Sequence, residues 1–377
     1  MIINARTISA LLYLIASKIN GKKADLPEDI SVEAVFALAK AHNLGALCAS
    51  ALSDISMCTD KMQEYRDKSI RKALLFDSER AQISAILSKK GIAHIPLKGI
   101  ILKELYPSLG DREMSDNDIL IDPKQRLDVK EIFVNRGYEV KFYEVFNEDV
   151  YLKSPIFNFE IHVSLFSNEH HELFYNYFSD TIEKSSPSFG ECRKMRPEEF
   201  YIYLTAHENK HFNNSGIGIR SLLDAFLFLR KEELDKEYIK DALEKLRLLE
   251  YEEKRTAIVN RIFDPEFSKK MMLGEAELMP EESEMLLYYA KSGAHGSHTN
   301  AIEKQVKHVY NGGRARYLFR RAVPDMEWYK IHAPFVYKSK VLIPFHVIMR
   351  LTLGLILSPT KIIKEIKIVK NIKKKKK

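Results

Sequence analysis

Three acidic side chains in the first half of the chain have the types and spacing of a metal site. Asp116 and Asp118 stand two residues apart at the start of an apolar run, 119–121. On a β-strand, residues two apart point to the same face, so both carboxylates would lie together. Glu160 lies in a second alternating segment, 157–163, whose apolar positions indicate a sheet packed on one side. Because hard divalent cations prefer carboxylate oxygens, these three residues are predicted to hold Mg²⁺ or Mn²⁺.

A Lys-Gly pair upstream predicts a phosphate site beside this metal site. Lys98 and Gly99 follow a short apolar strand, 95–97, and precede an expected amphipathic helix, 100–106. Glycine at such a turn lets backbone N–H groups approach a phosphate, and the helix N-terminus favours its negative charge. The lysine adds a mobile positive charge, and Arg112 is a further candidate phosphate ligand. Together these parts predict a site for a metal–triphosphate complex.

These residues resemble the minimal nucleotidyltransferases of the DNA polymerase beta superfamily. Within it, the chain is most similar to an uncharacterised bacterial nucleotidyltransferase family that carries Lys-Gly in place of the usual Gly-Ser. The matching residues are Lys98-Gly99, Tyr106-Pro107, Arg112, Asp116-x-Asp118 and Glu160-x-His162. The resemblance implies catalysis by Asp116, Asp118 and Glu160, with a nucleoside monophosphate passing from an NTP to a hydroxyl group and ATP as the expected NTP. The acceptor would be a sugar, a glycan precursor or a protein.

A helical segment further along contains the letters His-Glu-x-x-His at 207–211. On a helix, His207 and His211 share one face and Glu208 could act as a base, so a zinc peptidase is one interpretation. No recognisable third ligand accompanies them. The rival interpretation follows from the resemblance, which places His162, His207, His211 and Asp224 on the substrate side. In it, Asp224 hydrogen-bonds a histidine and selects its tautomer.

Hydrophobic periodicity divides the chain into four expected parts. Residues 1–90 are predicted to form a helical cap, 91–190 the catalytic core, and 191–334 a C-terminal helical domain. Residues 335–377 form an apolar and basic segment. The expected fold class is therefore α+β, with a small mixed polymerase-beta-like sheet flanked by all-α regions.

The positive charge of the chain is concentrated at one end. The net charge is +7, yet residues 361–377 alone contain nine lysines and one glutamate. The rest of the chain is near neutral, so no specific nucleic-acid partner is expected. Three scattered cysteines, without a Cys-x-x-Cys pair, favour a reducing cytoplasm.

The last expected segment suggests contact with a membrane surface. Residues 341–358 are largely apolar but contain Pro344, His346 and Arg350, which disfavours a membrane span. The lysines that follow alternate with isoleucines as in a basic amphipathic helix, which predicts peripheral contact with an anionic inner membrane face. A core helix followed by a solvated lysine tail is the alternative. For the whole protein, a nucleotide-binding pseudoenzyme that serves as an antitoxin-like partner is the alternative to an enzyme.

Overall fold

The structure is a computed structural model that describes residues 4–294, 296, 298–304, 306, 313–326, 328–329 and 333–372. The chain forms two compact units. One contains the residues up to Asn209 together with Gly218–Ala294, and the other contains Lys210–Ile217 and the residues from 295 onward. Each unit is described by itself below.

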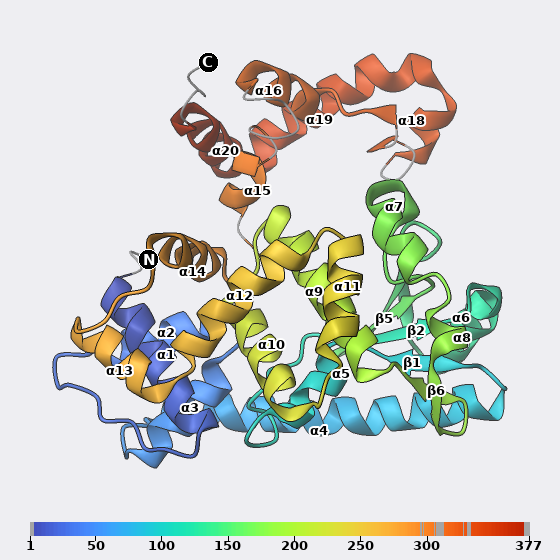
Figure 1. Cartoon of the computed structure of the whole chain (residues 1–377). Helices are drawn as coiled ribbons and strands as arrows, with labels where there is room; N and C mark the ends of the chain where they lie inside the picture. Colours follow the sequence, from blue (N-terminus) through green and yellow to red (C-terminus); the bar gives the residue numbers. More distant parts are fainter. Residues whose placement is uncertain are drawn as a thin grey trace. The chain divides into compact units, whose positions relative to one another are not determined.

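Four helices precede the first strand. They are α1 (Ala5–Ile19), α2 (Val32–Ala41), α3 (Gly45–Asp54) and the long α4 (Asp60–Lys89), which runs along the sheet (Figure 1). Asn4 and Ser31 cap α1 and α2 through side-chain oxygens that accept backbone N–H groups. Helix α13 (Pro265–Leu273) returns from late in the chain to pack against α1.

One mixed sheet of seven strands follows, in the order β3-β4-β5-β2-β1-β7-β6. The strands are β1 (His94–Pro96), β2 (Asn117–Ile121), β3 (Glu139–Phe142), β4 (Glu148–Lys153), β5 (Phe157–His162), β6 (Ser186–Phe189) and β7 (Cys192–Lys194). Strand β2 pairs parallel to β5 and antiparallel to β1. The expected α+β class with a mixed sheet and helices at both ends is confirmed.

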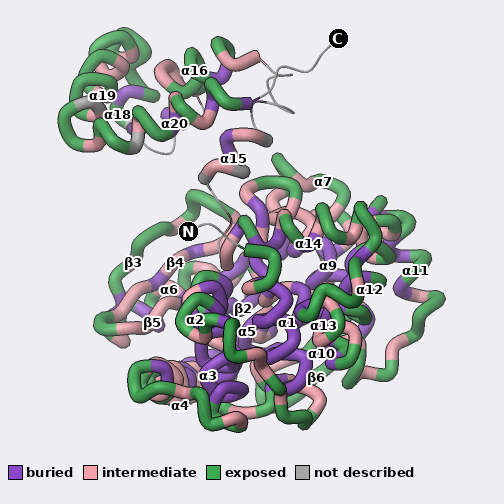
Figure 2. The backbone as a smooth tube through the Cα atoms, turned by 90° about the vertical axis from the view of Figure 1, so that its left-hand side faces the viewer, coloured by how far each residue is buried: buried purple, intermediate pink, exposed green. Residues whose placement is uncertain are grey.

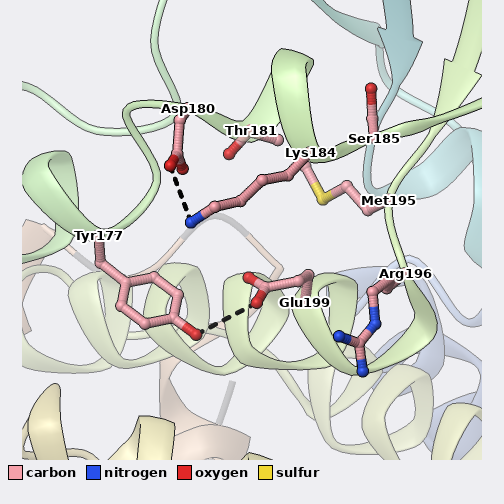
Figure 3. Close-up of a pocket in the computed structure, with 8 residues that line it drawn as sticks. All are labelled: Tyr177, Asp180, Thr181, Lys184, Ser185, Met195, Arg196 and Glu199. Atoms are coloured by element: carbon pink, nitrogen blue, oxygen red, sulfur yellow. Dashed lines mark hydrogen bonds and ion pairs between the residues drawn. The ribbon is translucent and has the colours of Figure 1, made fainter.

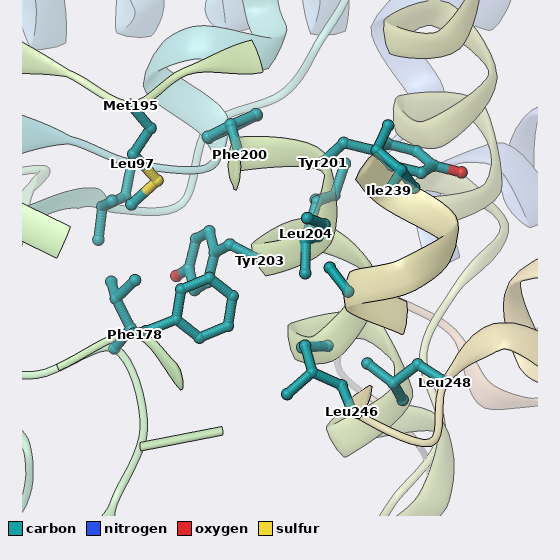
Figure 4. Close-up of a cluster of buried hydrophobic side chains, with 14 of the residues drawn as sticks. Leu97, Phe178, Met195, Phe200, Tyr201, Tyr203, Leu204, Ile239, Leu246 and Leu248 are labelled. Atoms are coloured by element: carbon teal, nitrogen blue, oxygen red, sulfur yellow. The ribbon is translucent and has the colours of Figure 1, made fainter. Parts of the chain in front are cut away.

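Both faces of the sheet are covered, although the apolar pattern of β5 predicted packing on one side only. Ile119, Ile121, Phe159 and Ile161 face α4 and α6 (Arg126–Asn135). On the other face, Leu97 and Leu120 join a second core with α9 (Pro197–Asn213), α10 (Ile219–Lys231) and α11 (Lys236–Lys245); Figure 4 shows Leu97 near Tyr203 of α9. The one-sided prediction is wrong because helices far along the chain return over the second face.

Shorter elements complete the first unit. The expected helix over 100–106 is only α5 (Gly99–Leu102), continued by a 3₁₀ turn, η1 (Lys103–Leu105). The remaining elements are η2 (Pro123–Gln125), α7 (Asn168–Tyr177), α8 (Thr181–Lys184), α12 (Leu249–Ile262) and α14 (Pro280–Ser292). The second unit contains α15 (His298–Lys304), α16 (Arg314–Ala322), α18 (Pro334–Lys338), η4 (Lys340–Leu342), α19 (Ile343–Leu357) and α20 (Pro359–Asn371). Among the described residues, no helix has the length and apolar character needed to cross a bilayer.

Candidate active site

The pairing of β2 with β5 brings two acidic residues together. Their parallel register sets Asp118 opposite Glu160, and Leu120 opposite His162. Potential ligand atoms of Asp118, Glu160 and His162 all lie within 4.8 Å of one another, and this is the one such group of three in the described part of the chain. Asp116, which immediately precedes β2, is outside that group. The resemblance places His162 on the substrate side, and that role stays a prediction; in the structure His162 lies beside the carboxylates.

Asp118 is the fixed centre of this group. It is buried, and its Oδ1 accepts hydrogen bonds from Lys98 Nζ at 2.7 Å and from His162 Nε2 at 2.8 Å. The backbone of Lys98 has φ 45° and ψ −116°, a conformation that glycine tolerates better than lysine. Such strained residues cluster at functional sites, where the surrounding structure must hold them in place. Here the strained turn directs the lysine to the aspartate.

Only one of the three carboxylates in the site, that of Asp118, is strongly stabilised in its ionised form by nearby positive charge. Burial disfavours ionised Asp118, but Lys98 and the His162 hydrogen bond outweigh it and hold the pKa of Asp118 well below its ordinary value. Burial raises the pKa of Glu160 to about 8, and the neighbouring charges of Asp118 and Asp116 act in the same direction. Burial and Asp118 also raise the pKa of Asp116. The cluster therefore has more carboxylates than nearby cations can stabilise, which is the condition that a bound divalent ion relieves.

Gly99 is required by packing. A Cβ at this position would lie 2.6 Å from Arg112 Nη1 and 3.0 Å from Met114 Cε. These contacts alone explain why a residue without a side chain is needed here, whether or not it binds a phosphate. The phosphate role predicted for Gly99 and the N-terminus of α5 is not tested by these contacts and stays a prediction.

Arg112 and Asp224 form a buried pair that the sequence did not predict. Arg112 Nε and Nη2 each donate to one oxygen of Asp224 at 2.8 Å, and the Tyr106 hydroxyl donates to the same carboxylate at 2.8 Å. The expected partner of Asp224 was a histidine, so the structure corrects that assignment. The pair ties the loop before β2 to α10. Arg112 thereby positions that loop, and its guanidinium is largely engaged.

Two cations near Asp116 escaped the sequence analysis. Arg220 on α10 donates from Nη1 to the Glu113 carbonyl at 2.9 Å, and its charge lowers the pKa of Asp116 against the larger effect of burial. Lys72 on α4 lies 5.0 Å from the centre of the Phe76 ring. Burial lowers the pKa of Lys72, while the charge of Asp116 raises it. Neither residue belongs to a motif, so only the fold identifies them as neighbours of the site.

In the described part of the chain, the His-Glu-x-x-His segment does not have the arrangement that the alternative zinc-peptidase interpretation requires. Glu208 is buried and accepts hydrogen bonds from Arg255 Nη1 and from the Tyr289 hydroxyl, each at 2.6 Å. A carboxylate held in this way is a structural ion-pair partner, not a base facing substrate. His207 and His211 also lie outside the metal-compatible group found among the described residues.

A small hollow elsewhere on the first unit has none of these residues in its lining. Figure 3 shows it between α7, α8 and the start of α9, with Lys184 paired to Asp180 at 2.8 Å and Tyr177 donating to Glu199 at 3.3 Å. Its other polar side chains also have partners: Thr181 and Ser185 donate to backbone carbonyls, and Arg196 pairs with Glu198. It therefore offers no competing site for the chemistry of the carboxylates.

Comparison with known protein families identifies the family of the chain. The model of an uncharacterised nucleotidyltransferase family matches residues 28–264, a span that contains every residue of the candidate site described above. The chain belongs to this nucleotidyltransferase family. It is therefore an enzyme of the nucleotidyltransferase class, with a nucleotide as substrate. The searches of curated proteins and of solved structures gave no match.

Proposed function

We propose that the protein transfers a nucleoside monophosphate from an NTP, with ATP as the expected donor, to a hydroxyl group of an acceptor. The observation that carries the proposal is the register of β2 and β5, which sets Glu160 beside Asp118, while Lys98 donates to Asp118 at 2.7 Å. Two converging carboxylates and a lysine match the needs of a metal-bound triphosphate.

The donor set fits a divalent cation. Asp118 and Glu160 would supply carboxylate oxygens. Asp116 lies outside that group but its charge interacts with that of Asp118, and we propose it as a third ligand; Asp116 and Glu160 are partly exposed. These oxygens suit Mg²⁺, and the nearby imidazole of His162 is compatible with Mn²⁺ as well. When bound, such an ion stabilises the triphosphate charge and makes the acceptor hydroxyl more acidic.

The residues of the chain would act mainly by holding charge in place. His162 and Lys98 fix the orientation of Asp118, and Arg112 keeps the loop before β2 in position. Arg220 and Lys72 are proposed to hold phosphate oxygens, together with Lys98. In the reaction, the acceptor oxygen bonds to the α-phosphorus, its proton passes to a site carboxylate, and pyrophosphate leaves.

The acceptor is proposed to be a hydroxyl of a sugar, of a glycan precursor or of a protein. We further propose a peripheral location at the inner face of a membrane for the enzyme, through its C-terminal segment. Support for that location comes from the charge and exposure of α19 and α20, which are described below.

The decisive experiment measures pyrophosphate release and label transfer from each α-labelled NTP, with cell extract as the source of acceptor. The Asp118→Asn protein is expected to lose at least about 100-fold in rate, because it removes the anion that Lys98 and His162 orient. The matched control is Asp128→Asn, which changes an exposed aspartate of α6. Equal rates for Asp118→Asn and wild type would overturn the proposal. Metal-dependent NTP binding without turnover for any acceptor would favour the pseudoenzyme.

A further inference from the structure

Helix α19 of the second unit exposes an unusual amount of apolar surface. Phe345, Ile348, Ile356 and Leu357 are between 62% and 75% exposed, and Val341 just before the helix is 78% exposed. Figure 2 shows α19 as largely exposed in the second unit. Contiguous exposed apolar surface of this kind marks a site of contact with a partner or a membrane.

The arginine within α19 does not interrupt this surface. Arg350 Nη2 donates to the Arg321 carbonyl at 2.8 Å, and its guanidinium lies 4.6 Å from the centre of the Trp328 ring. On the same side, the His346 ring lies 5.4 Å from that of Tyr329. Arg350 and His346 therefore face protein. Thr352 is exposed between the apolar side chains, and its hydroxyl donates to the carbonyls of Ile348 and Met349 within the helix.

Helix α20 adds positive charge next to this apolar surface. Lys364, Lys367 and Lys370 are exposed. The helix's one acidic residue, Glu365, is 9% exposed and accepts hydrogen bonds from Tyr317 at 2.6 Å and Arg321 at 2.9 Å. Because Glu365 is already neutralised within the unit, it does not offset the exposed lysines.

The whole C-terminal region shares this bias. Residues 295–377 contain nineteen lysines and arginines but only four acidic residues, a net charge of +15. Since the complete chain carries +7, the remainder carries −8. The sequence analysis divided the charge at residue 361 and found a near-neutral body. Dividing the chain at residue 295 instead gives an acidic part before it and a strongly basic part from it onward.

We propose that α19 and α20 form an interfacial site for an anionic phospholipid bilayer. The exposed face of α19 would lie among the upper acyl chains, and the α20 lysines would contact the lipid phosphates. Lipid is favoured over nucleic acid because large apolar side chains gain from acyl chains but have no equivalent partner along a phosphate backbone. A 15-residue helix is about 22 Å long, shorter than the ~30 Å hydrocarbon core, so it would lie in the plane of the interface. The proposal specifies how the peripheral location suggested above is achieved, and it does not depend on the transfer reaction.

The test is co-flotation of the full-length protein with vesicles of phosphatidylcholine, alone or mixed with phosphatidylglycerol. Wild type is expected to float with the anionic vesicles. Replacing Lys364, Lys367 and Lys370 together by Gln should weaken binding on the order of 100-fold at low salt, because each lysine contributes about fivefold. Replacing Ile348 and Ile356 together by Glu should weaken it at least about tenfold.

Controls separate lipid binding from misfolding and from other partners. Leu127→Glu changes an exposed leucine on α6 of the first unit and should bind vesicles like wild type. Trp328 is the only tryptophan of the chain, so Phe345→Trp in a Trp328→Phe background places one reporter on the exposed face of α19. Brominated lipids are expected to quench it, and circular dichroism should show that each variant is folded.

Three results would overturn the proposal. The first is flotation that the Ile348 and Ile356 replacements leave unchanged. The second is tight binding of a labelled oligonucleotide with no binding to either vesicle, which would assign the basic surface to nucleic acid. The third is a dimer in the absence of lipid that the same replacements convert to monomer, which would show that a second copy covers α19. NTP-dependent activity is measured on the same samples, so loss of the transfer reaction and loss of membrane binding can be told apart.

Discussion

Binding of Mg²⁺ or Mn²⁺ is expected to expel a proton from Glu160. Burial and the charges of Asp118 and Asp116 raise the pKa of this carboxyl to about 8, so it is mostly protonated at neutral pH. A carboxylate must be ionised to bind a metal, so metal binding and proton release are linked at this residue.

The size of the effect follows from the shifted pKa. With a pKa of about 8, roughly 0.9 proton is released per metal bound at pH 7, about 0.5 at pH 8 and about 0.1 at pH 9. The same shift acts on the metal-free protein. Because the pKa of folded Glu160 lies above its ordinary value of 4.5, the native state holds the extra proton, and stability falls as pH rises from about 4.5 to 8.

Titration calorimetry in buffers of different ionisation enthalpy measures this proton count directly. Relative to wild type, Glu160→Gln is expected to release fewer protons and to reduce the fall in stability between pH 5 and 8, which urea unfolding measures. Glu131→Gln, on the exposed side of α6, is the matched control and should behave like wild type. A proton count below about 0.2 at pH 7, in protein that does bind metal, would refute the reasoning. So would an undiminished count in Glu160→Gln.

Three further replacements test the buried charges. Asp224→Asn leaves buried Arg112 without its anion and is expected to cost about 3–5 kcal/mol of unfolding free energy, as measured in urea. Burial raises the pKa of Asp111 from 3.8 to about 6, so wild type loses stability as pH rises through this range. Asp111→Asn should therefore gain about 2 kcal/mol relative to wild type between pH 4 and pH 7, as followed by a pH series of urea melts. Glu208→Gln should cost a similar 3–5 kcal/mol by removing the nearest anion of buried Arg255, with no change in bound zinc by metal analysis.

Each of these expectations has a contrary result. Wild-type stability of Asp224→Asn would mean that Arg112 reaches solvent or another anion. A constant difference between Asp111→Asn and wild type across the pH series would show that Asp111 titrates normally in the folded protein. Zinc that purifies with wild type and disappears in His207→Ala would revive the peptidase interpretation.

Local patterns predicted the parts of the site that lie close to one another along strands. Alternation within 157–163 placed Glu160 on the face opposite Phe159 and Ile161, and the structure has this arrangement. The fold class followed from the change between helical and strand periodicity, and it is confirmed. These inferences succeeded because side-chain direction on a strand depends on position alone.

The second face of the sheet could not be inferred in this way. A strand with one polar face looks the same whether that face meets water or a returning helix. Here α9 and α10 return over it, which buries Asp118 and raises the pKa of Glu160. The chemical character of the site therefore depends on residues about 40 to 100 positions away from its carboxylates.

The sequence by itself determined which residues could do chemistry: the carboxylates at 116, 118 and 160, the lysine at 98, and the basic helix near the end of the chain. Only the tertiary structure decided their partners. In the folded chain, Asp224 pairs with Arg112, Glu208 with Arg255, and Asp118 with His162. Arg350 packs over the Trp328 ring. The physical reason is that a buried charge must find an opposite charge or a hydrogen bond wherever packing brings one, and packing joins positions that no local spacing relates.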